Sequence, residues 1–132
     1  MSESEQHRQL VAMIIQYIKT RIKTEYTCLI ETDLSDNRPI PGVTKEGFRP
    51  DVFFEYEGLL LIGEAKTYGD VLREHSLKQY KSYIRKCSLY KGKAEYIMAV
   101  PWLEQASVKN KLNIIRKDFP GDYDIIVIGG IV

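Results

Sequence analysis

Residues 49–66, RPDVFFEYEGLLLIGEAK, constrain the fold more strongly than any other stretch of the chain. The stretch contains two apolar runs that are separated only by Glu57 and Gly58. A short turn between two strand-like runs predicts an antiparallel β-hairpin, because the chain must reverse direction there. A sheet built around this hairpin is therefore expected.

Charged side chains stand where the two strands of the hairpin begin and end. Pairing around the turn places Asp51, at the start of the first strand, across from Glu64 near the end of the second. Side chains alternate between the faces of a strand, so Glu64 and Lys66 project from one side and Ala65 from the other. The hairpin thus predicts that Asp51, Glu64 and Lys66 form one cluster.

Such a cluster is unfavourable without a counter-ion, because two neighbouring carboxylates repel and lose hydration on an apolar sheet. Mg²⁺ takes oxygen ligands and keeps several waters, so two carboxylates and a phosphate suit it. Lys66 could position a water or stabilise charge on a phosphate. The alternative is a buried salt-bridge network of Asp51, Lys66 and Glu64 that only fixes the sheet.

The other periodic segments predict an α/β fold, a mixed central sheet flanked by helices. A long loop with two prolines and two glycines is expected over 34–48. The expected order is helix, three strands, helix, strand, helix and strand, over 3–23, 26–32, 51–56, 59–66, 70–90, 94–100, 103–117 and 123–131.

The motif and this element order together resemble the PD-(D/E)XK nuclease superfamily. The "PD" is Pro50–Asp51, and "EAK" follows the hairpin at 64–66. The resemblance extends from about residue 3 to 100 and implies a restriction-endonuclease-like core. It further implies that Asp51 and Glu64 bind the metal, that the Ala65 carbonyl adds a ligand, and that Lys66 serves the attacking water.

The helix after the motif carries a second feature of the family. Gln79 and Tyr83 have the Q-x-x-x-Y spacing found in several nuclease branches, and His75 precedes them by one helical turn. This flank is expected beside the apolar face rather than on it, where it could meet the metal site or a phosphate. A polar helix boundary with satisfied side chains is the alternative.

The first helix offers a further ligand. Family members often place a glutamate there, ahead of two apolar residues, and His7 holds that position in this chain. Glu3 lies one turn earlier on the same stripe, whereas Glu5 projects elsewhere. His7 or Glu3 could therefore approach the metal, unless this terminus frays and has no role.

Basic residues precede the motif in the expected loop. Arg38, Lys45 and Arg49 suit contact with a phosphate backbone. Tyr56 and Tyr68 could stack on bases, although single aromatic residues near strand ends usually pack in a core.

The bulk properties bound the class of protein. The 132 residues suffice for one domain, 1–132. No apolar run approaches a membrane span and the N-terminal segment is polar, so a cytoplasmic protein is expected. Cys28 and Cys87 lack metal-like spacing and are expected to be buried free thiols. The net charge of +1 neither indicates nor excludes a nucleic-acid partner.

These observations predict a Mg²⁺-dependent nuclease, with Mn²⁺ able to substitute, that hydrolyses phosphodiester bonds and takes DNA as its expected substrate. A homodimer or a subunit of a larger nuclease assembly would extend its small surface. The alternative is a non-catalytic member of the same fold that binds nucleic acid or protein. No Gly-rich phosphate loop, CxxC pair, HExxH or G-x-S-x-G motif supports other hydrolase classes.

Overall fold

The structure, a computed structural model, describes residues 3–22, 30–31 and 43–130. Its elements follow the expected order, with one 3₁₀ helix added before the last helix. They are α1 (Glu3–Arg21), β1 (Ile30–Glu31), β2 (Val52–Tyr56), β3 (Leu59–Ala65), α2 (Glu74–Leu89), β4 (Lys93–Pro101), η1 (Trp102–Glu104), α3 (Gln105–Arg116) and β5 (Tyr123–Gly130).

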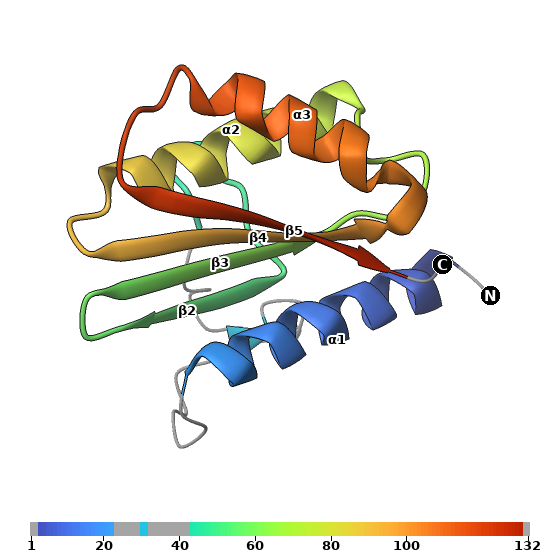
Figure 1. The fold of residues 1–132 in the computed structure, drawn as a ribbon, viewed down its shortest axis with the longest axis horizontal. Coiled ribbons are helices and arrows are strands. Elements are labelled where there is room, and N and C mark those ends of the chain that lie inside the picture. Colours follow the sequence, from blue (N-terminus) through green and yellow to red (C-terminus); the bar gives the residue numbers. More distant parts are fainter. Residues whose placement is uncertain (1–2, 23–29, 32–42, 131–132) are drawn as a thin grey trace.

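The strands form one mixed sheet in the order β1-β2-β3-β4-β5. The pairs β1–β2 and β2–β3 are antiparallel, whereas β3–β4 and β4–β5 are parallel. In Figure 1, α1 covers one face of the sheet, and α2 and α3 cover the other. The predicted α/β class with a mixed sheet between helices is confirmed.

The hairpin turn has the backbone that its residues allow. Glu57 and Gly58 both have positive φ, 48° and 80° respectively. Two consecutive residues with positive φ are typical of a type I′ turn, whose twist matches that of the strands. The register pairs Val52 with Gly63, so Asp51 stands across from Glu64 as expected.

Each face of the sheet has its own apolar core. Leu60 and Ile62 of β3 pack in the core beneath α2 and α3, whereas Leu61 and Ala65 pack in the core above α1. Because β3 is covered on both faces, its sequence is a nearly continuous apolar run rather than an alternating one. Glu64 is the charged residue within that buried strand.

Some boundaries differ from the expectation. The helix expected over 70–90 begins at Glu74, because turns occupy the preceding residues and Gly69 has a φ of 90°. Pro101 is the last residue of β4 rather than the residue that stops it. Of the strand expected over 26–32, the structure describes only Ile30–Glu31.

Two further expectations concern cysteines and membranes. Cys87 is a buried free thiol, as predicted, while Cys28 lies outside the described residues. Within the ranges that the structure describes, no helix has the length and apolar character to cross a bilayer.

Gly63 allows α1 to approach the sheet closely, and this contact can be tested. A Cβ at Gly63 would lie 2.6 Å from Ile14 Cγ2 and 3.1 Å from Val52 Cβ. The Ile14 side chain is stiff in a helix, so Gly63→Ala is expected to lower the free energy of unfolding by about 1–3 kcal/mol. In an Ile14→Ala background, Gly63→Ala should lower the free energy of unfolding much less. Urea unfolding of wild type, the two single variants and the double variant measures this coupling. Equal costs in both backgrounds would contradict the contact.

Candidate functional site

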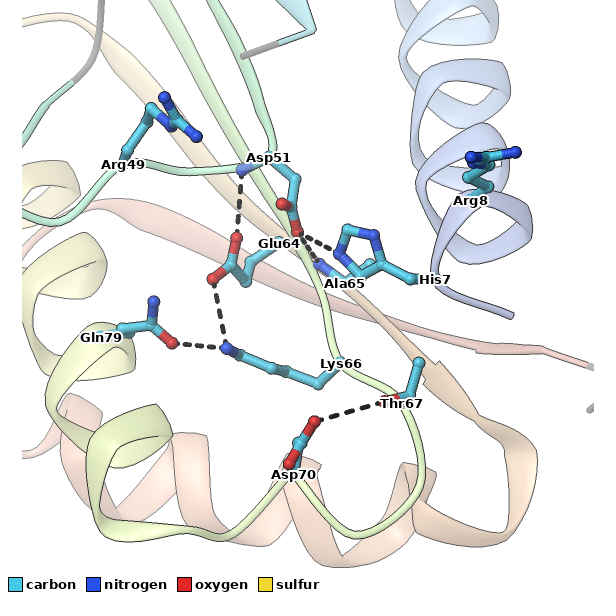
Figure 2. Close-up of a pocket in the computed structure, with 10 residues that line it drawn as sticks. All are labelled: His7, Arg8, Arg49, Asp51, Glu64, Ala65, Lys66, Thr67, Asp70 and Gln79. Atoms are coloured by element: carbon cyan, nitrogen blue, oxygen red, sulfur yellow. Dashed lines mark hydrogen bonds and ion pairs between the residues drawn. The ribbon is translucent and has the colours of Figure 1, made fainter. Parts of the chain in front are cut away.

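The predicted cluster lies in a cleft of about 530 Å³ at the end of β3. Figure 1 shows that α1 begins at this end of the sheet, where β3, β4 and β5 finish. Figure 2 shows the residues that line the cleft, which are His7, Arg8, Arg49, Asp51, Glu64, Ala65, Lys66, Thr67, Asp70 and Gln79.

Asp51 and the end of β3 are joined by reciprocal hydrogen bonds. The Asp51 backbone N–H donates to Glu64 Oε1 over 3.1 Å. In return, the Ala65 N–H donates to Asp51 Oδ2 over 2.9 Å. His7 Nε2 of α1 lies 3.2 Å from the same Asp51 oxygen. The carboxylates of Asp51 and Glu64 are therefore held in fixed positions by backbone groups of the two strands (Figure 2).

Glu64 is almost fully buried, and its charge is poorly compensated. Its Oε2 lies 3.7 Å from Lys66 Nζ and accepts a hydrogen bond from the Tyr83 hydroxyl at 3.4 Å. Burial, together with the nearby negative charge of Asp51, raises the pKa of the Glu64 carboxyl well above its ordinary value. The protonated form of Glu64 is thereby favoured when nothing else supplies positive charge.

The pKa of Asp51 is shifted in the opposite direction. Burial alone would raise the pKa of Asp51, but hydrogen bonds with His7, Glu64 and the Ala65 N–H outweigh burial and lower it. The two neighbouring carboxyls thus have their pKa values shifted in opposite directions, which makes Glu64 rather than Asp51 the more readily protonated group.

The donor set fits a hard divalent cation such as Mg²⁺ or Mn²⁺. A cation beside the pair would offset the repulsion and burial that raise the pKa of Glu64, and two carboxylates with a carbonyl and water are the ligands such ions take. In the described part of the chain, no three His, Cys, Asp or Glu side chains are arranged as a ready-made metal cluster. Asp51 and Glu64 would hold the ion with help from the Ala65 carbonyl.

The strand geometry directs the Ala65 carbonyl toward the side of β2, away from β4. The next residue, Lys66, donates its N–H to Ala99 of β4, whereas the Ala65 N–H turns the other way, to Asp51. A residue's N–H and C=O point to the same side of a strand, so the Ala65 carbonyl also faces the side of β2. Beyond the start of β2 at Val52 that side opens into the cleft.

Lys66 is directed into the cleft by a partner on α2. Its ammonium donates to Gln79 Oε1 over 2.5 Å, and its side chain is only 16% exposed. Lys66 and Gln79 both line the cleft, as the sequence predicted. The amide of Gln79 thus orients the lysine beside Glu64 (Figure 2).

Tyr83 lies elsewhere than expected. It is buried in the core beneath α2 instead of on a flank beside the apolar face. Its ring packs against Tyr96 with 5.7 Å between centroids. Burial, and then the charge of Glu64, raises the pKa of Tyr83, so the phenol stays protonated and donates to that carboxylate from behind the cleft.

Two other predicted residues do not line the cleft. His75 is exposed and its ring stands edge-on to Phe48, with 5.6 Å between centroids. Lys45 is exposed and lines a separate pocket beside α2. Arg38 and the side chain of Glu3 lie outside the described part of the structure. The expected extra group on α1 that reaches Asp51 is His7.

Sequence reasoning missed Arg8, Thr67 and Asp70, which also line the cleft. Arg8 follows His7 on α1, and the other two follow the EAK motif in a turn. Asp70 accepts from the Thr67 hydroxyl at 3.4 Å and pairs with Arg73 at 3.2 Å. Adjacency to the motif residues was the available signal for all three.

The segment before Asp51 is anchored to α2 by buried hydroxyls. Ser82 Oγ lies 2.6 Å from both Thr44 Oγ1 and Glu46 Oε1. Arg85 pairs with Glu46 at 2.9 Å, and the Phe48 N–H donates to the Thr44 hydroxyl. These bonds fix the path of residues 44–48, and hence the place of the cleft residue Arg49.

Comparison of the chain with models of protein families, with curated proteins and with solved structures gives no match.

The raised pKa of Glu64 predicts how the thermal stability of the protein depends on pH in buffer that contains EDTA. A carboxyl whose pKa is raised on folding stabilises the protein fully below its ordinary value, near 4.5, and this contribution is lost as the pH rises through the raised pKa. Glu64→Gln removes that titration, so the variant should melt at a higher temperature than wild type at pH 8. The difference should shrink or reverse near pH 5. A constant difference across this pH range, measured by thermal denaturation, would contradict the raised pKa.

Proposed function

We propose that this protein is a divalent-cation-dependent nuclease with a restriction-endonuclease-like core. The observation that carries the proposal is the convergence of Asp51, Glu64 and Lys66 at the end of β3, in a cleft that Ala65 also lines. Two neighbouring carboxyls, one of them buried with a raised pKa, are expected of a cation site in the absence of its ion.

The arrangement of elements supports the same proposal. An antiparallel hairpin that carries the motif continues through parallel strands, with α1 on one face and two helices on the other. The motif sits at the end of β3, where α1 and α2 both reach it. This combination is what the resemblance to the PD-(D/E)XK superfamily implies.

The chemistry divides between the ion and the chain. When bound, the cation supplies charge that neutralises a scissile phosphate and makes a nearby water more acidic. Lys66, oriented by Gln79, donates hydrogen bonds to the attacking water or to the phosphate as negative charge develops there. Arg8 and Arg49 supply further positive charge from opposite walls of the cleft, where flanking phosphates would pass.

The substrate class follows from these charges. The proposed partner is a nucleic acid, with DNA as the first substrate to test. A homodimer or a larger nuclease assembly would add recognition surface, because a cleft of this size contacts few nucleotides.

A second function has an observation in its favour. Hydrogen bonds among Asp51, Glu64, Ala65 and their neighbours hold these side chains in place without an ion. A non-catalytic member of the fold that binds nucleic acid or protein would have this network as a structural device. The two functions differ in whether a cation binds the carboxylate pair.

Cation binding is predicted from the charge of the pair. At an ion concentration about 100 times its Kd, Mg²⁺ or Mn²⁺ should stabilise the protein by about 2.7 kcal/mol, seen as a rise in melting temperature. Asp51→Asn should abolish the rise because it removes a charged ligand. Asp118→Asn changes an exposed aspartate after α3 and should leave the rise intact. Equal rises in wild type and Asp51→Asn would place the ion elsewhere.

Cleavage is predicted to depend on Lys66. With Mg²⁺ and DNA, Lys66→Ala should cut at least about 100-fold more slowly than wild type, since it removes a donor next to the reacting atoms. Lys78→Ala changes an exposed lysine on the same α2 helix that Gln79 belongs to, and should cut normally. Gels of labelled single-stranded, duplex and branched DNA measure both. Cation binding without cleavage of any of these would favour the non-catalytic function.

A further inference from the structure

Four exposed apolar side chains follow the ends of β3 and β4, the strand ends at which the cleft lies. Tyr68 and Trp102 are 63% and 58% exposed, and Leu72 and Leu103 are 46% and 63% exposed. Single exposed apolar residues are ordinary, but two aromatic rings and two leucines that leave the sheet at one edge are typical of an interaction surface. These four residues are called the aromatic rim below.

The sheet topology brings the two aromatic residues of the rim to one edge. Ala65 of β3 pairs with Ala99 of β4, and the two strands run parallel. Tyr68 and Trp102 each follow their paired alanine by three residues, so both leave the sheet at the same edge. Figure 1 shows η1 and the segment between β3 and α2 at that end of the molecule.

Tyr68 of the rim is joined to the cleft by a short turn. Tyr68 stands between Thr67 and Asp70, both of which line the cleft. The turn is held by a hydrogen bond from the Asp70 N–H to the Thr67 carbonyl at 3.2 Å, and Gly69 adopts a φ of 90°. One side of this turn therefore faces the candidate metal centre while the Tyr68 ring is exposed to solvent.

The chemistry of cleft and rim selects one kind of occupant. Arg8, Arg49 and Lys66 in the cleft suit phosphates, and the rings of Tyr68 and Trp102 offer flat faces for stacking. Bases in a duplex are already stacked on one another, so their faces are not accessible to these rings. We infer that the strand entering the cleft is single-stranded there, with unpaired bases stacked on Tyr68 and Trp102. This inference rests on the proposed function, because it places the scissile strand in the cleft.

Trp102 is the sole tryptophan of the chain, so its fluorescence reports on the rim directly. The protein is titrated, with Ca²⁺ in place of Mg²⁺, with three probes of equal phosphate number: an oligothymidylate, an abasic oligonucleotide and a hairpin duplex. Gels confirm that the probes remain intact. The oligothymidylate should quench the emission saturably, and the other two should quench it far less.

Variants separate stacking from charge. Tyr68→Ala and Trp102→Ala should each weaken binding of a labelled oligothymidylate by about tenfold, measured by fluorescence anisotropy, because each removes one stacking platform. Trp102→Phe keeps an aromatic face and should retain most of the affinity. Leu89→Ala alters a residue that is 67% exposed at the far end of α2, and should bind as wild type does.

Two results would overturn the inference. One is equal quenching by the abasic or duplex probe. The other is Trp102 emission that changes with protein concentration alone, together with self-association lost in Trp102→Ala, which would make the rim an interface between copies. Failure of the proposed function is separable: base-dependent quenching without any Mg²⁺-dependent cleavage would reject the nuclease and retain a single-strand-binding surface. Mg²⁺-dependent cleavage without base-dependent quenching would retain the nuclease and reject the single-strand-binding surface.

Discussion

The register of the β2–β3 hairpin is the constraint on which the site depends. The turn at Glu57 and Gly58 sets this register, and the reciprocal bonds between Asp51 and the end of β3 close it at the other end. Because strand side chains alternate, a slip of one residue would turn Glu64 toward the α1 face and separate it from Asp51. The same register buries Gly63 beneath Ile14, so packing of α1 resists the slip. Stability and the geometry of the site thus rest on one pairing.

Among the sheet residues whose burial the structure describes, two glutamates are buried, and their partners show that Glu64 is exceptional. Glu95 of β4 is buried too, but Arg21 forms a direct ion pair with it and the Tyr17 hydroxyl donates to it at 3.4 Å. Glu64 also accepts hydrogen bonds, from the Asp51 N–H and the Tyr83 hydroxyl, but its ion pair is weaker, because Lys66 Nζ lies 3.7 Å away and is already bonded to Gln79. A buried carboxylate that serves only the fold is normally paired as Glu95 is. The shortfall of positive charge at Glu64 is what a cation would supply, and it points to a site kept for function at some cost in stability.

Local patterns were sufficient to predict the hairpin and the carboxylate pair, because turn chemistry and strand alternation act over a few residues. They were insufficient for Tyr83. The spacing of Gln79 and Tyr83 shows that they are neighbours on a helix, but only packing of the helix on the sheet determines which flank is buried. The predicted places of His75 and Lys45 are wrong for a related reason. Lys45 lies in residues 44–48 and His75 packs on Phe48, and the path of this segment depends on buried hydrogen bonds to Ser82, 34 to 38 positions away in sequence.

The change from antiparallel to parallel pairing within the sheet explains why the cleft and the aromatic rim lie at the same edge. Antiparallel pairing of β2 with β3 brings the start of one strand to the end of the other, which joins Asp51 to Glu64. Parallel pairing of β3 with β4 then makes both strands end at that same edge, so Trp102 and the turn that carries Tyr68 leave the sheet at one end. Open α/β sheets commonly bind ligands beyond the carboxyl ends of their parallel strands, where loops can vary without disturbing the core. In this chain one such edge carries acidic, basic and aromatic groups, which is the combination that the proposed function and the inferred single strand require.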